Sequence, residues 1–405
     1  MIAPLKISRA GLGVPIGILT ALLLTTGASA RPDKSPTLKG AYKGQFYVGV
    51  AINRAIATGE TMGFGNRTME LMKQDIALTK EQFNQISPEN DLKWSLIHPR
   101  EGADGYDFRA ADAYVNFGLK NHMVIVGHTL VWHGQTPNWV FAGTAPEADT
   151  PVQTPAAPAR GFGFRGPRTT RAELLQRMRD HIHTVVGRYK GKIKVWDVVN
   201  EAISDGGPNV LRDSLWVQII GPDFIDKAFE YAHEADPDAI LRYNDYGLEN
   251  PEKRQKLITL IKGLQARKVP VMAIGTQTHV SVSSPSVEEE DRTLTDLETL
   301  GLPIHITELD VNSAEGGQRS NGADVANNAA TTQGGLVNDA DQRLAHQYAN
   351  LFQVFLKHKK AVKVVTLWGI NDGVSWRSEG KPLLFDGNDQ PKPAFDAVIQ
   401  AAKSK

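Results

Sequence analysis

Two glutamates stand at the ends of stretches whose composition is typical of buried strands. The first stretch, KVWDVVNEAISD (194–205), is mostly apolar as far as Asn200 and Glu201 and then breaks into a polar, glycine-rich turn. The second, PIHITELDV (303–311), carries Glu308 near its end. An ionised carboxylate in such a place carries a desolvation penalty unless it is paired, hydrogen-bonded or used in chemistry. Both positions are therefore candidates for acid–base or nucleophilic chemistry.

Eight short apolar stretches are predicted to be strands, and amphipathic helical patterns alternate with them. Two of the clearest helices are predicted at 169–191 and 341–358, where apolar residues recur at three- and four-residue spacing. The predicted strands are 46–52, 83–89, 123–132, 194–202, 239–245, 271–280, 303–311 and 362–370.

This alternation predicts an α/β fold, a single (β/α)8 TIM barrel built on a closed parallel sheet. A doubly wound open sheet is the main alternative. That fold usually carries a glycine-rich phosphate turn after its first strand, and the corresponding stretch here, VGVAINRAI, has none.

Two segments, 142–168 and 312–340, are rich in Pro, Gly, Ala, Asn and Thr and show neither a helix nor a strand period. They are predicted to be long loops, inserted after the third and seventh strands within one catalytic domain that spans 31–405. In a barrel both loops would emerge on the face that carries the active site.

Polar residues at the C-terminal ends of barrel strands converge on one mouth. Glu201 ends the fourth predicted strand and Glu308 the seventh, so the two carboxyls are expected to approach each other across that mouth. Strand alternation, counted over 197–201 and 304–310, predicts that both side chains point inward. A facing carboxyl pair is the machinery of glycoside hydrolysis. One glutamate alone would more simply cap a helix or form a salt bridge.

The other side chains expected at this mouth suit a sugar ligand. Indole rings offer flat apolar faces to pyranose rings, while amide, imidazole and ammonium groups bond hydroxyls. A single Trp at a strand end is more often part of the core, but a cluster favours binding. The expected set is Glu89, Asn90, Lys93, Trp94, His128, Trp132, His133, Tyr243, Asn244, Asp245, Tyr246, Gln277, His279, Asp310, Trp368 and Trp376.

Composition excludes several other classes of function. Lys+Arg and Asp+Glu both count 45, so no global field attracts nucleic acid or anionic lipid. The chain has no cysteine, which excludes disulfides, thiolate metal sites and a cysteine nucleophile. His128 and His133 are five residues apart and would point to opposite faces of a strand, and neither an HExxH nor a GxSxG motif is present. No metal and no cofactor are expected.

The N-terminus is typical of a secretory signal peptide, predicted over 1–30. Lys6 and Arg9 precede an apolar run that ends in the small residues Ala28–Ala30. The run is shorter than the roughly 20 residues that a spanning helix needs. The mature chain would carry 43 basic and 45 acidic residues. We expect export to the periplasm or the medium, with no membrane association after cleavage.

Eight motifs, in order from about Gly40 to Ala401, resemble the signatures of family 10 glycoside hydrolases, the retaining endo-β-1,4-xylanases. They are ENDLKW, GHTLVWHGQTPNWV, VWDVVNEA, YNDY, GTQTH, HITELDV, LWGINDGVSW and PLLFDGNDQPKPAF. The resemblance implies xylan and xylo-oligosaccharides as substrates. We also expect no cofactor and action as a monomer.

The resemblance also implies roles for single residues. Glu201 matches the general acid/base and Glu308 the nucleophile, while Asn200 resembles the residue that bonds the sugar 2-hydroxyl. His279 and Asp310 resemble the partners that keep the nucleophile ionised. Contacts to sugars on the non-reducing side match Glu89, Asn90, Lys93, His128, Trp132, Gln277, Trp368 and Trp376, and Tyr243 would be a platform on the leaving-group side.

Two single positions depart from the family pattern: Gly134, where a small hydroxyl residue is usual, and Arg242, where an apolar residue is common. A retaining mechanism requires carboxyls roughly 5–5.5 Å apart, so the pKa of Glu201 should be raised while Glu308 is ionised. The alternatives are a barrel that binds xylan without cutting it, and a glycosidase that prefers cellulose-type or mannan chains.

Overall fold

The computed structural model describes residues 36–60, 67–143, 166–314 and 338–403, and Pro36 onward belongs to one compact unit. The predicted signal peptide at 1–30 lies outside the described residues. So does most of the two predicted insertions at 142–168 and 312–340.

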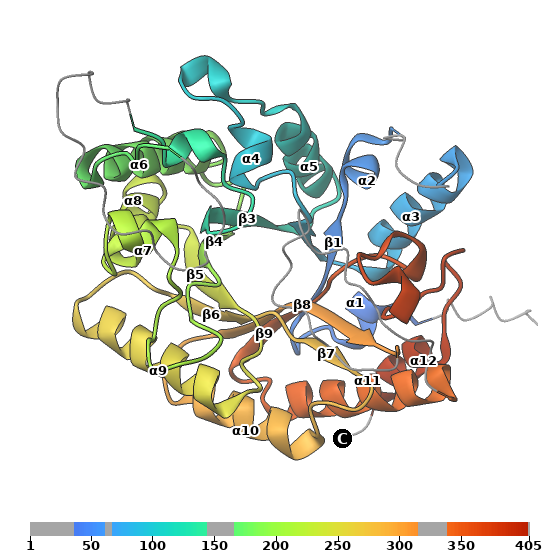
Figure 1. Ribbon diagram of the computed structural model, residues 1–405. Helices are drawn as coiled ribbons and strands as arrows, with labels where there is room; N and C mark the ends of the chain where they lie inside the picture. The colour runs from blue at the N-terminus through green and yellow to red at the C-terminus, as the bar shows by residue number, and fades with distance from the viewer. Residues whose placement is uncertain (1–35, 61–66, 144–165, 315–337, 404–405) are drawn as a thin grey trace, which may run out of the picture. The chain divides into compact units, whose positions relative to one another are not determined.

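Within the described residues, eight parallel strands close into a barrel, and helices surround them (Figure 1). The strand order is β6-β5-β4-β3-β2-β1-β9-β8, and pairing of β6 with β8 closes the ring. The predicted TIM barrel is confirmed, and all eight predicted strands are present. Their bounds are β1 Tyr47–Ile52, β2 Gln85–Pro88, β3 Val124–Trp132, β4 Val195–Asn200, β5 Ile240–Asp245, β6 Ala273–Thr276, β8 Ile304–Asn312 and β9 Val362–Leu367.

The predicted sixth strand, 271–280, is split in two. β6 ends at Thr276, and a short β7, His279–Ser281, then pairs in parallel with the outer end of β8. Between them Thr278 has a positive φ of 59°. The break lifts the chain away from the ladder and brings His279 beside β8.

The helices begin and end close to the predicted positions. The stretch predicted at 169–191 forms α6, capped by the Thr170 hydroxyl, which accepts a hydrogen bond from the Glu173 amide (3.2 Å). No helix among the described residues is long and apolar enough to span a bilayer. The α-helices are α1 Leu38–Ala41, α2 Arg54–Thr58, α3 Met69–Gln82, α4 Trp94–Ile97, α5 Arg109–Lys120, α6 Arg171–Arg188, α7 Leu215–Ile219, α8 Phe224–Ala235, α9 Pro251–Ala266, α10 Val287–Glu298, α11 Ala340–Lys357 and α12 Pro393–Ala401, and short 3₁₀ helices lie at Ala103–Gly105, Asn138–Val140, Asp372–Val374 and Ser378–Gly380.

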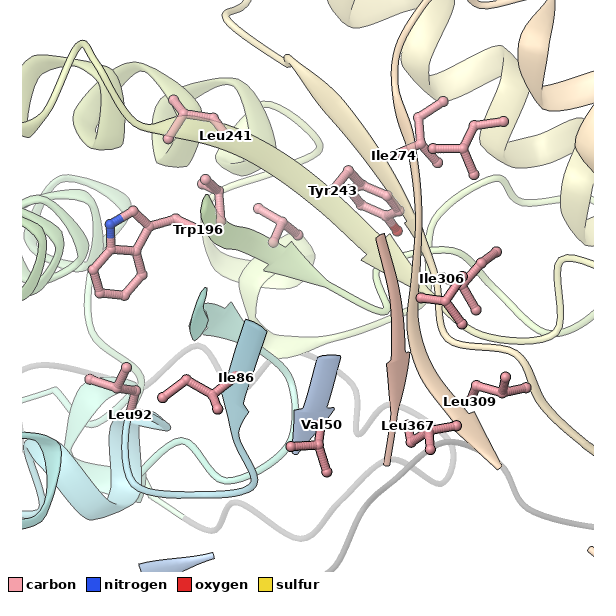
Figure 2. Packing of buried hydrophobic residues seen from close by; sticks show 14 of the residues in the cluster. Val50, Ile86, Leu92, Trp196, Leu241, Tyr243, Ile274, Ile306, Leu309 and Leu367 are labelled. Carbon is pink, nitrogen blue, oxygen red and sulfur yellow. The ribbon is translucent and has the colours of Figure 1, made fainter. Parts of the chain in front are cut away.

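The hydrophobic core lies between the strands and the helices. Val50, Leu241 and Ile306, on strands from different parts of the ring, are fully buried in it (Figure 2). The Trp196 indole is also fully buried, and an added Cβ at Gly127 would lie 2.1 Å from its ring. Gly127 on β3 therefore provides the space for the largest side chain of β4.

Inside the barrel, below the mouth, a buried charged cluster replaces apolar packing. Arg242 donates twice to the Asp197 carboxylate (2.6 and 2.8 Å) and once to His305 Nδ1 (3.0 Å). His128 Nδ1 lies 3.1 Å from the same carboxylate. Burial would raise the pKa of Asp197, but Arg242 and His128 hold it at about 2. The unusual Arg242 is thus explained as the counter-charge of a fully buried aspartate.

The predicted strand alternation around the two glutamates is wrong. On β8, His305 and Thr307 point into the barrel, since they contact Arg242 and Asn244 of β5, so Ile304 and Ile306 face the helices. The register of β8 against β9 then shifts between Ile306 and Leu309.

A similar register shift in β4 follows Asp197, and Glu201 comes after it with a left-handed φ of 55°. Asp197 and Asn200 both point inward although they are three residues apart. Irregularities at the strand ends, and not simple alternation, direct the two glutamates to the mouth.

The interior cluster gives a stability prediction. Replacing Arg242 with Met leaves the Asp197 charge buried without its main partner, and we expect the free energy of unfolding to fall by about 3–5 kcal/mol at neutral pH. Because the folded-state pKa of Asp197 lies below its unfolded value, this contribution is present above about pH 4 and is lost as pH falls toward 2. Denaturant titration at several pH values measures it.

The double variant Asp197→Asn/Arg242→Met is the matched control. It leaves no unpaired charge and should be more stable than Arg242→Met alone. A single variant that loses less than about 1 kcal/mol, the range of an exposed pair, would contradict the assigned role of Arg242.

Candidate active site

Glu201 lies just beyond β4 with its carboxylate almost completely buried. Three uncharged side chains donate to it: Trp132 Nε1 to Oε2 (2.8 Å), Gln277 Nε2 to Oε1 (2.9 Å) and Asn200 Nδ2 to Oε1 (3.2 Å). Burial raises the pKa of Glu201 above its ordinary value, and the hydrogen bonds from Gln277 and Trp132 oppose this rise without cancelling it. The negative charges of Asp245 and Glu308 add to the rise.

Glu308, on β8, is equally buried but has a charged neighbour. Asn244 donates to its Oε1 (2.8 Å), and His279 Nε2 donates to its Oε2 (3.2 Å). Burial alone would raise the pKa of Glu308, but the hydrogen bond from His279 and the charges of His128 and His279 outweigh it and lower the pKa. Two neighbouring carboxyls with opposite shifts suit one group to donate a proton and the other to act as an anion.

Shared amides join the two carboxyls. Asn244 Nδ2, which donates to Glu308, also donates to Asn200 Oδ1 (2.9 Å), and Asn200 in turn donates to Glu201. Gln277 bonds Glu201 through its side chain and accepts from the backbone N–H of Glu308 (3.0 Å). The structure thus brings both glutamates to one part of the barrel mouth.

A chain of alternating charges stands behind Glu308. His279 Nδ1 lies 3.1 Å from Asp310 Oδ2, and Asp310 also accepts from Trp376 Nε1 (2.7 Å) and Arg377 Nη1 (2.8 Å). Burial would lower the pKa of His279, but Asp310 and Glu308 outweigh burial and raise it to about 9. His279 is therefore an imidazolium between two carboxylates. The sequence did not single out Arg377, although it follows directly after Trp376.

Aromatic rings line the rest of this region. The Trp368 ring centroid lies 5.4 Å from that of His128, and the partly exposed Trp376 lies 5.0 Å from His279. Beside Trp132, the Lys93 ammonium lies 5.1 Å from the indole centroid.

The segment after β2 brings polar groups to the same part of the mouth. Lys93 donates to Asn90 Oδ1 (3.0 Å), and Gln135 Nε2 also donates to that oxygen (3.4 Å). Burial raises the pKa of the half-buried Glu89 to about 7, with Lys93 opposing the rise. These side chains supply hydrogen-bonding groups beside Trp132, the indole that donates to Glu201.

Tyr243 does not have the predicted geometry. Its ring is fully buried in the core, and its hydroxyl donates to Asp245 Oδ2 (2.7 Å) and accepts from the amides of Ala202 and Ile203 (Figure 2). The prediction of a sugar platform at Tyr243 is therefore wrong. Arg242 and Asn244 point into the barrel, so alternation already directs Tyr243 outward.

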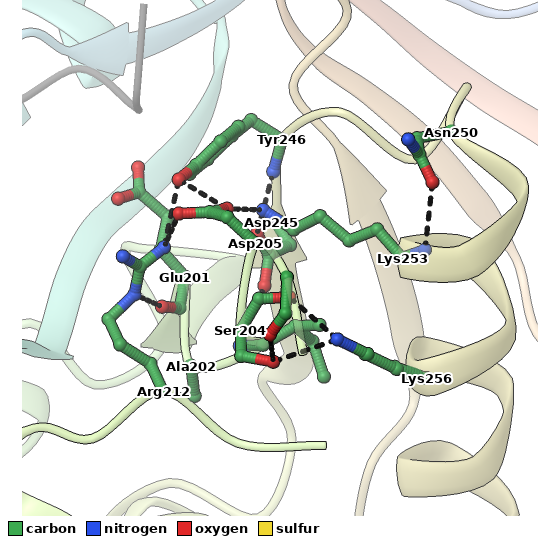
Figure 3. A network of polar contacts seen from close by, with 12 residues as sticks. Glu201, Ala202, Ser204, Asp205, Arg212, Asp245, Tyr246, Asn250, Lys253 and Lys256 are labelled. Carbon is green, nitrogen blue, oxygen red and sulfur yellow. Dashed lines mark hydrogen bonds and ion pairs between the residues drawn. The ribbon is translucent and has the colours of Figure 1, made fainter. Parts of the chain in front are cut away.

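Tyr246 lies near Glu201 instead. Its hydroxyl donates to Asp205 (2.6 Å) and accepts from Arg212 (2.8 Å), and Arg212 Nε donates to the backbone carbonyl of Glu201 (3.1 Å) (Figure 3). The Lys253 ammonium stands 3.3 Å from the centroid of the Tyr246 ring. The sequence placed Tyr246 at the mouth without a role, and Arg212 carried no motif.

His133 is half-buried beside Trp132. Its ring lies 5.7 Å from Trp132, and burial lowers its pKa to about 3. An added Cβ at Gly134 would lie 2.9 Å from the same indole, so glycine leaves room for Trp132 there. Among the residues that the structure describes, no three acidic or imidazole side chains form a group suited to a metal ion.

Comparisons with known proteins agree with this geometry. The sequence model of glycosyl hydrolase family 10 matches residues 37–401. The β-1,4-xylanase of Dictyoglomus thermophilum is 36% identical over 378 residues, which cover 92% of each chain. The endo-1,4-β-xylanase A of Caldicellulosiruptor sp. (strain Rt8B.4) is 40% identical over 91% of this chain, which spans only 48% of that longer relative.

Solved structures give the same result. An endoxylanase retrieved from a sugarcane soil metagenome superposes with a TM-score of 0.75 at 37% identity, covering 91% of this chain and 99% of its own. A mutant of the intracellular xylanase of Thermoanaerobacterium saccharolyticum, in complex with xylotetraose, has a TM-score of 0.72 at 35% identity, covering 90% and 98%.

The charge chain behind Glu308 gives a second prediction. Asp310→Asn removes the carboxylate that raises the pKa of His279 and leaves the opposing charge of Arg377 in place. The pKa of His279 should fall from about 9 by at least one unit. NMR titration of the His279 ring measures this.

Asp291→Asn serves as the control, because Asp291 contacts His358 (2.9 Å) and not His279. It should leave the His279 titration unchanged. A His279 pKa that does not move in Asp310→Asn would show that Asp310 does not stabilise the imidazolium.

Proposed function

The chain belongs to glycosyl hydrolase family 10, and from that membership and the site geometry we propose that it is an endo-acting β-1,4-xylanase with a retaining, double-displacement mechanism. The observation that carries the proposal is the pair Glu201 and Glu308, joined by shared amides and shifted in opposite directions. Named relatives that are endo-1,4-β-xylanases support xylan as the substrate.

In the first step, the Glu308 carboxylate attacks the anomeric carbon and the bond to the leaving sugar breaks. Glu201 gives its proton to the departing oxygen. This division of roles requires Glu308 ionised and Glu201 protonated. Activity should therefore fall as pH decreases through the lowered pKa of Glu308 and as it increases through the raised pKa of Glu201.

In the second step, Glu201 removes a proton from water, and the resulting hydroxide oxygen displaces Glu308 from the sugar. Once Glu308 is bound covalently, its charge no longer raises the pKa of Glu201. Glu201 then becomes a stronger acid, so its carboxylate form is available as the base for this step. Asn200, between the two carboxyls, is proposed to bond the sugar 2-hydroxyl.

The substrate contacts are proposed from the resemblance to the family, and the positions of the side chains at the mouth support them. Those beside Lys93 and around His279 are proposed to bind the non-reducing side: Glu89, Asn90, Lys93, His128, Trp132, Gln277, Trp368 and Trp376. Tyr246 replaces Tyr243 as the proposed contact on the leaving-group side, because it lies in the network that reaches Glu201 (Figure 3). Both catalytic glutamates come from one chain, so one copy supplies the complete pair whatever the oligomeric state.

Parallel assays of reducing ends on xylan and on carboxymethylcellulose test the substrate proposal. We expect the wild-type protein to act on xylan at least about 10-fold faster, since one badly fitted group changes kcat/KM by about that factor. Glu308→Ala should abolish turnover of every substrate. Glu201→Ala should spare the first step for aryl glycosides with good leaving groups, because their departure needs little proton donation.

The first-formed sugar should keep the β configuration, which NMR of the fresh product measures. Folded wild-type protein that binds xylan and releases no reducing ends would favour the binding-protein alternative. Equal loss with good and poor leaving groups in Glu201→Ala would contradict its role as the acid.

Export is proposed on the N-terminal pattern alone. Lys6, Arg9, the apolar run and Ala28–Ala30 support cleavage after Ala30. Family membership does not decide the matter, since one similar structure is of an intracellular xylanase. In a bacterial host, mass spectrometry of the exported protein should find Arg31 as its first residue. Full-length protein that stays in the cytoplasm would contradict export.

A further inference from the structure

Glu201 has a backbone conformation that few side chains adopt. Its φ of 55° lies in the left-handed region, which costs a non-glycine residue roughly 1–2 kcal/mol. Such a conformation persists only where neighbouring groups hold it. The conformation matters because it directs the Glu201 carboxylate to its place beside Gln277 and Trp132.

Every backbone hydrogen-bonding group of Glu201 and Ala202 has a partner. The Glu201 amide donates to the Asn244 carbonyl (2.9 Å), and the Ala202 amide to the Tyr243 hydroxyl (2.9 Å). Arg212 supplies both remaining donors. Its Nε donates to the Glu201 carbonyl (3.1 Å), and its backbone amide donates to the Ala202 carbonyl (2.8 Å).

The intervening loop folds back on itself to bring Arg212 to this position. Ile203 and Leu211 form an antiparallel bridge, and the Ser204 amide donates to the Val210 carbonyl (3.0 Å). Residues 203–211 therefore form a narrow hairpin-like loop, and Arg212 follows it directly. The loop brings Arg212 back beside Ala202 and so sets its contact with Glu201.

A network of ion pairs and hydrogen bonds with balanced charges holds the guanidinium of Arg212 in place. It pairs with Asp205 (3.0 Å) and donates to the Tyr246 hydroxyl (2.8 Å) (Figure 3). Lys253 in turn binds Asp205 (2.8 Å) and Asp245 (3.0 Å). A planar guanidinium held by several partners in different directions has little freedom to turn, which a lysine ammonium could not match.

We propose that Arg212 is a positioning residue for the general acid/base: the hydrogen bond from its Nε to the Glu201 carbonyl holds the left-handed backbone that directs the Glu201 carboxyl toward the leaving-group oxygen. This role rests on the proposed glycosidase function of Glu201. Arg212 touches the backbone of Glu201, so its loss should weaken proton donation and leave the Glu308 nucleophile intact. A displacement of about 1 Å can cost about 100-fold in rate.

Arg212→Gln and a series of aryl β-xylobiosides test the role. With poor leaving groups, kcat/KM should fall about 10- to 100-fold, because their departure depends on the proton. With a dinitrophenyl leaving group it should fall less than about 3-fold, so that kcat/KM depends more steeply on leaving-group pKa. A loss of general structure would lower all substrates alike.

Asp205→Asn is a second variant in case Arg212→Gln does not fold. The Asp205 side chain is 39% exposed, and its loss frees the guanidinium from one anchor without removing Arg212. It should steepen the leaving-group dependence in the same direction by a smaller factor.

Two further variants separate the hydrogen bond from charge. Arg212→Lys keeps the charge but has no Nε donor, and should resemble Arg212→Gln. Lys256→Gln removes a cation that bonds Ser204 in the same loop (2.9 Å), and should leave the dependence unchanged. Recovery in Arg212→Lys, or an unchanged dependence in a folded Arg212→Gln, would overturn the positioning role. Wild-type protein inactive on xylan would instead refute the proposed function.

Discussion

The site depends on one electrostatic constraint: two buried carboxyls that share amide neighbours cannot both carry a charge comfortably. Burial raises the pKa of each, so burial alone does not distinguish them. The difference comes from their donors. Glu201 accepts from an indole and two amides, all uncharged, whereas Glu308 accepts from an amide and the His279 imidazolium. The hydrogen bond from His279 and the charges of His128 and His279 therefore favour the anion at Glu308, whereas the uncharged donors leave the proton on Glu201.

The His279 imidazolium also needs stabilising partners, and the barrel supplies them as a chain of alternating negative and positive charges. His279 is held between Glu308 and Asp310, and Asp310 is balanced by Arg377. Below the mouth, Asp197 and Arg242 form a second buried ion pair, in which each charge again balances the other. Each buried charge is matched by the next, which limits the desolvation cost of a charged site at the end of an otherwise apolar fold. Arg242 is unusual in sequence because it belongs to this interior pairing, and not because it contacts substrate.

The sequence was sufficient for the eight strands, because their apolar runs record burial on both faces of a parallel sheet. It also identified both glutamates, but the simple strand alternation from which their side-chain directions were predicted was wrong. The register shifts in β4 and β8 and the left-handed Glu201 depend on pairing between distant strands, which one strand's own pattern does not contain. The prediction of a sugar platform at Tyr243 was wrong for the opposite reason. Alternation does apply on β5, and it directs the Tyr243 ring into the core.

The two glutamates are also supported in different ways, and their chemistry explains why. In the proposed mechanism Glu308 must stay anionic until it attacks, so a fixed cation against its carboxylate helps. Glu201 must release and regain a proton in each cycle, and a cation bonded to its carboxylate would favour the anion and weaken the acid. Arg212 instead binds the backbone carbonyl of Glu201, and its charge is balanced by Asp205. Support through the backbone fixes the position of the acid while its carboxyl remains able to titrate, which is what a group that serves as acid and then as base requires.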